Sequence, residues 1–113
     1  SRLDEIIQRT RDGGAEIVKL LKTGSAFYAP GVSAIEMAES ILKNQNKILP
    51  CCILAQGQYG ISEQFLGLPV ILSSEGVKKV IEIKLTPEEQ KELAVSASHV
   101  KELCNFIDES GLI

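Results

Sequence analysis

The chain has few of the residues that carry out chemistry. Among its 113 residues there are one histidine, three cysteines and no tryptophan. It contains neither a Gly-x-Gly-x-x-Gly run after a strand nor a Gly-Lys-Ser sequence, so it lacks the loops that cradle nucleotide phosphates. The only histidine, His99, has Glu102 three residues later, which makes a pair on a helix surface rather than an oriented general base. We therefore expect no catalytic residue here and a partly exposed structural role for His99.

The cysteine pattern disfavours both disulfides and a metal site. The number of cysteines is odd: they are Cys51, Cys52 and Cys104. The two adjacent ones are expected to point to opposite faces of a strand. No Cys-x-x-Cys spacing is present, and Glu36 and Glu39 are better explained as a solvated helix face than as metal ligands. We predict no metal, and buried, reduced thiols in a cytoplasmic protein.

The chain also lacks a basic excess and a long apolar run. Its formal net charge is −3, without the positive footprint that nucleic-acid binding requires, and the same balance disfavours membrane surfaces. No segment approaches the roughly 18 apolar residues of a membrane span. The chain begins without methionine and shows no signal-peptide character, which favours a processed chain, an expression scar or a piece cut from a longer protein. We expect neither nucleic acid nor membrane as a partner.

What is present is typical of one globular domain. Apolar residues make up 44% of the chain, charged residues 24%, and the mean hydropathy is +0.10. No internal repeat, low-complexity segment or long linker divides residues 1–113. We therefore predict a single domain with one modest core.

Hydrophobic periodicity predicts two helices followed by three strands. Apolar residues recur at helical spacing over 3–22, and Gly13-Gly14 inside this range indicates a kink or a close backbone approach, with plain flexibility as the alternative. A second helix over 32–44, capped by Ser33, is so apolar that it is largely buried or lies in a subunit interface. The strand-forming segments are 47–55, 68–73 and 77–85, which we expect to form an antiparallel sheet with one covered face.

The clearest local signal predicts a C-terminal helix. Thr86 is the cap, Pro87 takes the first helical position and Glu89 completes a capping box, while Gly111 closes the helix. Its apolar stripe, Leu93, Ala97, Val100, Cys104 and Ile107, should cover the sheet. The predicted fold class is α+β, with a kinked N-terminal helix, a buried second helix and a three-stranded antiparallel sheet covered by the C-terminal helix.

The loop predicted between the first two helices has an unusual composition. Gly24–Gly31 reads GSAFYAPG, which is mostly small and apolar, with two aromatic side chains and one hydroxyl. Such a loop suits the wall of a small-molecule pocket better than a reactive centre.

Six short stretches occur in a distinctive order. They are Arg9–Val18 (RTRDGGAEIV), Lys22–Pro30 (KTGSAFYAP), Ala34–Ser40 (AIEMAES), Leu49–Cys51 (LPC), Gly57–Gly60 (GQYG) and Gly67–Val70 (GLPV). In this order they closely resemble the C-terminal part of NAD-dependent malate dehydrogenases of the type related to lactate dehydrogenase. The resemblance spans about residues 4–107, which is nearly the whole chain.

This resemblance implies an enzyme that moves a hydride between NAD and the malate/oxaloacetate pair. In that family the dinucleotide-binding domain, the substrate-binding arginines and the catalytic aspartate and histidine lie upstream, and none of their motifs occurs here. His99 is followed by Val100 and Lys101, so it does not match the catalytic histidine of the family. We expect no NAD bound to this chain and no activity from the chain alone.

The resemblance assigns a pocket wall to Ser25, Ala26 and Pro30. In the family, the matching loop lies against the substrate and the nicotinamide ring. Lactate dehydrogenases typically have threonine where Ala26 stands and isoleucine where Pro30 stands, so these two residues favour malate dehydrogenase. A small side chain leaves room for the second carboxylate of oxaloacetate, which an upstream arginine would bind through two hydrogen bonds.

The first two helices resemble the subunit-packing helices of the family. We therefore expect a homo-oligomer, because such contacts bury surfaces that a lone domain leaves wet. The alternative from a different functional class is a non-enzymatic module, derived from this family, whose activity is self-association.

Overall fold

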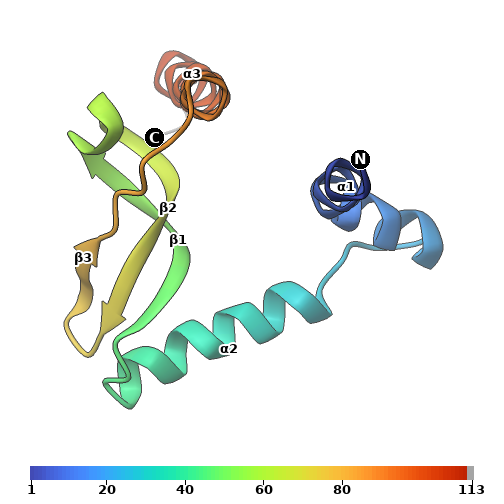
Figure 1. Cartoon of the computed structure of the whole chain (residues 1–113), viewed down its shortest axis with the longest axis horizontal. Coiled ribbons are helices and arrows are strands. Elements are labelled where there is room, and N and C mark those ends of the chain that lie inside the picture. The colour runs from blue at the N-terminus through green and yellow to red at the C-terminus, as the bar shows by residue number, and fades with distance from the viewer. Residues whose placement is uncertain (112–113) are drawn as a thin grey trace. The chain divides into compact units, whose positions relative to one another are not determined.

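The computed structural model describes residues 1–111 and has the predicted α+β class (Figure 1). Two helices come first, then three strands and a last helix: α1 (Arg2–Leu21), α2 (Tyr28–Leu42), β1 (Lys47–Gln56), the 3-10 turn η1 (Gln58–Gly60), β2 (Ser62–Ser73), β3 (Gly76–Val80) and α3 (Pro87–Ser110). The chain divides into two compact units, residues 1–38 and the part from residue 39 onward. None of the described helices combines the length and hydropathy needed to cross a membrane.

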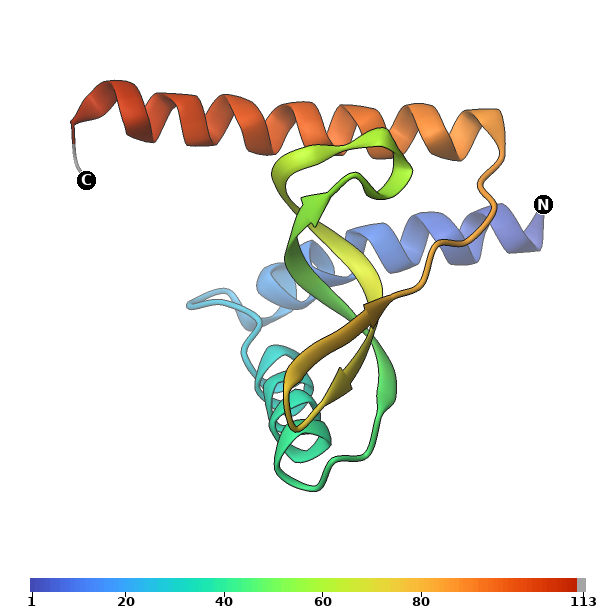
Figure 2. The same ribbon diagram turned by 90° about the vertical axis from the view of Figure 1, so that its left-hand side faces the viewer.

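The bend predicted in α1 is present. In Figure 1 the first half of α1 is seen nearly end-on and the second half from the side, and Figure 2 shows the reverse. A Cβ atom added at Gly13 or Gly14 would meet nothing within 4 Å, so close backbone approach does not explain these glycines within this unit. The helix begins with a capping box between Ser1 and Asp4 and ends at Lys22, whose φ is 63°.

The start of α2 differs from the prediction. The helix begins at Tyr28 rather than at Val32, so Ser33 lies inside it and is not its cap. The reason is that Pro30 falls in the first turn, where a backbone N–H is not needed and a fixed φ suits the helix. The first helical hydrogen bond runs from Gly31 N to Phe27 O, at 2.9 Å. The connecting loop is therefore 22–27, shorter than the predicted 24–31.

The prediction that α2 is buried is wrong for this chain. Ser40 is its one buried residue, while Val32 and Ile35 are 65% and 63% exposed. Ser40 lies in the last turn of α2, where its Oγ donates to Leu72 O at 2.7 Å and accepts from Lys47 N at 3.3 Å. Burial in a subunit interface, the other half of the expectation, stays a prediction.

The three strands form one antiparallel sheet in the order β1-β2-β3. β2 begins earlier than predicted, at Ser62, and β3 ends earlier, at Val80 rather than Leu85. The early end of β3 follows from Pro69 in the neighbouring strand. Ile81 N donates to Pro69 O at 2.8 Å, but proline has no N–H to return, so the ladder stops there.

The core lies between β2 and the first half of α3. Leu66, Leu68 and Ala97 are at its centre, and Ile53, Tyr59, Ile61, Val80 and Leu93 pack around them. In Figures 1 and 2, α3 crosses the end of the sheet that lies next to η1. The predicted stripe is thus only partly correct, because Cys104 and Ile107 lie in the second half of α3 and are exposed.

The ends of α3 are confirmed. Thr86 Oγ1 accepts from Glu89 N at 3.3 Å, and the Glu89 carboxylate accepts from Thr86 N at 2.8 Å. These hydrogen bonds hold the pKa of Glu89 below its ordinary value. Gly111 ends the helix with a φ of 64°, in the left-handed region that glycine favours.

Candidate functional site

The three residues predicted for the pocket wall lie on one connecting segment. Ser25 is exposed and Ala26 half-buried in the loop 22–27, and Pro30 is exposed in the first turn of α2. Next to them, the rings of Phe27 and Tyr28 contact each other at a centroid distance of 4.7 Å, tilted by 45°, and both are exposed. The segment therefore presents small side chains, the Ser25 hydroxyl and two exposed aromatic rings.

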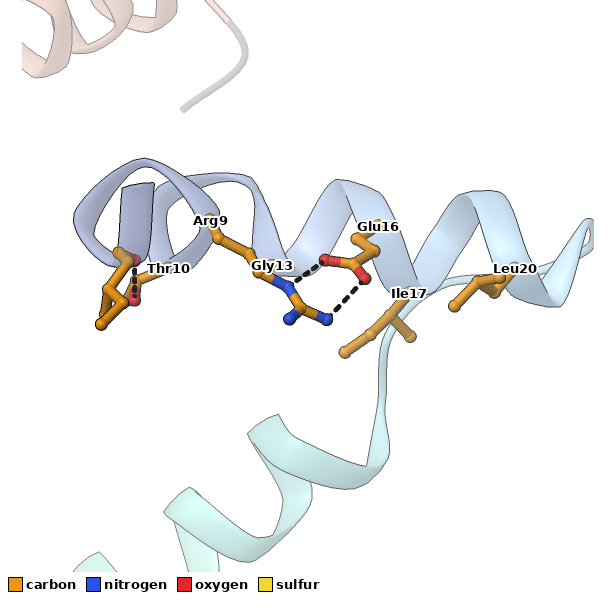
Figure 3. A pocket seen from close by; sticks show the side chains of 7 residues that line it. Arg9, Thr10, Gly13, Glu16, Ile17 and Leu20 are labelled. Carbon is orange, nitrogen blue, oxygen red and sulfur yellow. Dashed lines mark hydrogen bonds and ion pairs between the residues drawn. The ribbon is translucent and has the colours of Figure 1, made fainter. Parts of the chain in front are cut away.

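The helix before this segment, α1, carries a groove that the sequence did not predict. It has a volume of about 470 Å³, and Figure 3 shows the side chains that line it. Its lining residues come from both halves of the helix: Ile6, Arg9, Thr10, Gly13, Glu16, Ile17 and Leu20. The sequence does contain a signal for this groove, since Ile6, Ile17 and Leu20 fall on one face of the helix, on both sides of the two glycines.

An ion pair crosses the bend inside this groove. Arg9 Nη2 lies 3.1 Å from Glu16 Oε1, and Arg9 Nε donates to Glu16 Oε2 at 3.3 Å, so the guanidinium makes two parallel contacts. The hydrogen bonds, and secondly the opposite charges, raise the pKa of Arg9 and lower the pKa of Glu16. Both groups are therefore charged at neutral pH.

The cysteine prediction is correct for one thiol and wrong for two. Cys51 is buried, whereas Cys52 and Cys104 are exposed, and all three are free. Cys52 faces the opposite side of β1 from Cys51, as the alternation requires, and Cys104 lies where α3 extends past the core. Burial raises the pKa of the Cys51 thiol, which lowers its reactivity.

The other candidate ligands and bases do not converge. Over residues 1–111, no group of three or more His, Cys, Asp or Glu side chains gathers closely enough to hold a metal ion. Glu39 pairs with Lys43 at 2.6 Å, which lowers the pKa of Glu39. His99 is exposed on α3. Neither Glu39 nor His99 thus belongs to a metal-binding cluster among the described residues.

Comparison with known proteins places these features in a family. The model of the lactate/malate dehydrogenase α/β C-terminal domain matches residues 1–109. A malate dehydrogenase of Cereibacter sphaeroides is 52% identical over 112 residues, which cover 96% of this chain and 35% of that protein.

Solved structures show the same relationship. The malate dehydrogenase of Salinibacter ruber is 45% identical with a TM-score of 0.87, over 96% of this chain and 37% of that one. The lactate dehydrogenase of Eimeria maxima, solved with NADH and oxamate, is 39% identical with a TM-score of 0.90, over 96% of this chain and 35% of that one. The chain therefore spans about a third of the length of these relatives.

Proposed function

This chain belongs to the lactate/malate dehydrogenase family, and from that membership we propose that it is the substrate-side part of a malate dehydrogenase. The whole enzyme interconverts malate and oxaloacetate with NAD. The observation that carries the proposal is the 52% identity to a malate dehydrogenase over 96% of the chain. Ala26 and Pro30, which differ from the lactate-dehydrogenase pattern, support the choice of substrate.

The described residues do not fit a bound dinucleotide. A nucleotide-binding turn joins a strand to the N-terminus of an α-helix through closely spaced glycines, and the one connection from a strand to an α-helix among the described residues, 81–86, contains no glycine. In the proposal, NAD is therefore held by a separate domain of the longer enzyme. The chain alone has no turnover.

The role proposed for this chain is to shape the pocket. Ala26 ends at its Cβ atom, so the wall stays open for the second carboxylate of a dicarboxylic substrate. Ser25 adds a hydroxyl beside it, and Pro30 fixes the backbone where the loop enters α2. The three free thiols fit the reducing cytoplasm, where the proposal places the enzyme.

A chimera tests the proposal. This chain replaces the matching 112 residues of the Cereibacter sphaeroides malate dehydrogenase. We expect the chimera to oxidise NADH with oxaloacetate, and much more slowly with pyruvate, which lacks the second carboxylate. A chimera that is folded by circular dichroism and binds NADH, yet does not reduce oxaloacetate, would contradict the proposal.

Self-association is the second part of the proposal. The apolar side chains of α1 and α2 are exposed, Val32 and Ile35 among them, and a matching face on a second copy would bury them. Sedimentation of the chain at micromolar concentration should therefore show a dimer or larger species. The double variant V32D/I35D should weaken association by roughly tenfold or more, which corresponds to about 1.4 kcal/mol.

A matched control uses the other unit of the chain. Leu103 and Phe106 on α3 are as exposed as Val32 and Ile35, at 65% and 66%, so the double variant L103D/F106D adds the same two charges to a surface that the proposal leaves free. It should leave the association unchanged. A strictly monomeric parent chain at these concentrations would contradict the expectation.

The exposed apolar helices also favour a second candidate, a non-enzymatic self-association module. The two candidates differ in what precedes this segment in the coding sequence. A Gly-x-Gly-x-x-Gly strand–helix unit upstream would support the enzyme, and a start close to Ser1 would support the module.

A further inference from the structure

The residues around Gly13 explain why α1 can bend, but not what stabilises the bent form. Figure 3 shows Arg9 and Thr10 on the first half of the helix, Glu16 and Ile17 on the second, and Gly13 between them. Glycine is a poor helix former, so the Gly13-Gly14 pair makes the helix easy to deform. Thr10 Oγ1 also donates to Ile6 O at 2.8 Å, a side-chain contact that often bends helices. These features permit bending, and a contact across the bend would stabilise one form.

The Arg9–Glu16 pair is a contact of this kind. Two turns of an α-helix take about seven residues, so these residues lie on nearly the same face and about 10 Å apart along a straight axis. That spacing exceeds the three- and four-residue separations at which helix side chains normally meet. Bending toward their shared face brings them together, and the guanidinium then contacts both carboxylate oxygens, at 3.1 and 3.3 Å.

We propose that the Arg9–Glu16 pair is a latch that holds α1 in its bent form and so positions the loop 22–27. The second half of α1 leads directly into that loop, which carries Ser25 and Ala26, and all of these residues belong to the same unit. In this role Arg9 and Glu16 are positioning residues. Their effect on substrate rests on the proposed function, whereas their effect on the helix does not.

The expected size of the effect follows from exposure. The Arg9 and Glu16 side chains are 78% and 43% exposed, and exposed ion pairs contribute little to global stability. A bent and a straight helix of similar free energy respond to a small bias, however. Loss of the pair should shift the ratio of bent to straight α1 by about two- to fivefold. Because the pair is exposed, 1 M salt should shift the ratio in the same direction.

Distance measurements between spin labels test the latch in this chain. Labels are placed at cysteines introduced by E5C and K19C, on the two halves of α1, after the three native thiols are replaced. We expect R9Q and E16Q to move the distance distribution toward longer separations, and the charge exchange R9E/E16R to restore it. The variant R9K keeps the charge but loses the two-pronged contact, so it should lie in between.

The variant R2Q is the matched control, since it removes the same charge from the same helix away from the bend. It should leave the distribution unchanged. Circular dichroism of each variant confirms that α1 is still helical. If R9Q and E16Q give the distribution of the parent chain, or if R2Q gives the same change as R9Q, the latch is wrong.

The positioning role is tested in the chimera. There R9Q and E16Q should raise the KM for oxaloacetate by about two- to fivefold, and R9E/E16R should recover it. If R9Q and E16Q change the distance distribution in this chain but not the KM of the chimera, the positioning role is wrong and the latch stands. If the spin-label distances change as expected but the chimera without these substitutions is inactive, the proposed function is wrong instead.

Discussion

Replacement of Ala26 by threonine in the chimera is expected to lower kcat/KM for oxaloacetate by roughly 10- to 200-fold relative to kcat/KM for pyruvate. Threonine adds a methyl and a hydroxyl group at the wall where the proposal places the second carboxylate. Pyruvate lacks that carboxylate and does not need the space. The measurement is the ratio of the two kcat/KM values, from initial rates of NADH oxidation.

The substrate ratio removes general effects on folding or NADH binding, because these would lower both values together. The same change at Ala94, which is exposed on α3, provides the matched control and should leave the ratio unaltered. An A26T chimera that keeps the parent's preference for oxaloacetate would show that Ala26 does not line the substrate.

Replacement of Leu68 by alanine should lower the free energy of unfolding by about 2–5 kcal/mol. Leu68 is 2% exposed at the centre of the contact between β2 and α3, so the change deletes buried methyl groups and leaves a cavity. Leu103 lies on α3 and is 65% exposed, so L103A should change stability by no more than about 0.5 kcal/mol. Urea unfolding of this chain measures both values. Equal losses would mean that the β2–α3 contact is not the core of its unit.

Local signals predicted the elements whose determinants are close in sequence. The capping box at Thr86 and the glycine at 111 define both ends of α3 without reference to the rest of the chain. The start of α2 was less clear because two signals competed. Ser33 with Glu36 has the spacing of a capping box, but Pro30 is equally at home in a first turn, and the structure uses Pro30.

The end of β3 depends on a residue far away in sequence. Nothing near Ile81 stops a strand there, and its partner Pro69 becomes relevant only once the register between β2 and β3 is known. The exposure of α2 has a similar origin. Its apolar composition predicts a covered helix, but composition does not say whether the cover comes from the same chain or from another.

The pocket wall is a prediction from the sequence, whereas the groove on α1 comes from the structure alone. The composition of the loop and the family resemblance selected Ser25, Ala26 and Pro30, and whether they face a substrate stays a prediction. The sequence does not predict the groove on α1 or its ion pair, because Arg9 and Glu16 are seven residues apart. Side chains at that spacing do not usually meet on a helix, and the contact becomes apparent only in the bent structure.

The proposed function requires two parts: this chain shapes the substrate pocket, and a separate dinucleotide-binding domain holds NAD. The most direct test measures NADH oxidation with oxaloacetate by equimolar samples of the isolated chain and of the chimera, in one assay. We expect turnover by the chimera and none above background by the isolated chain. Turnover by the isolated chain, or a folded, NADH-binding chimera without turnover, would contradict this division.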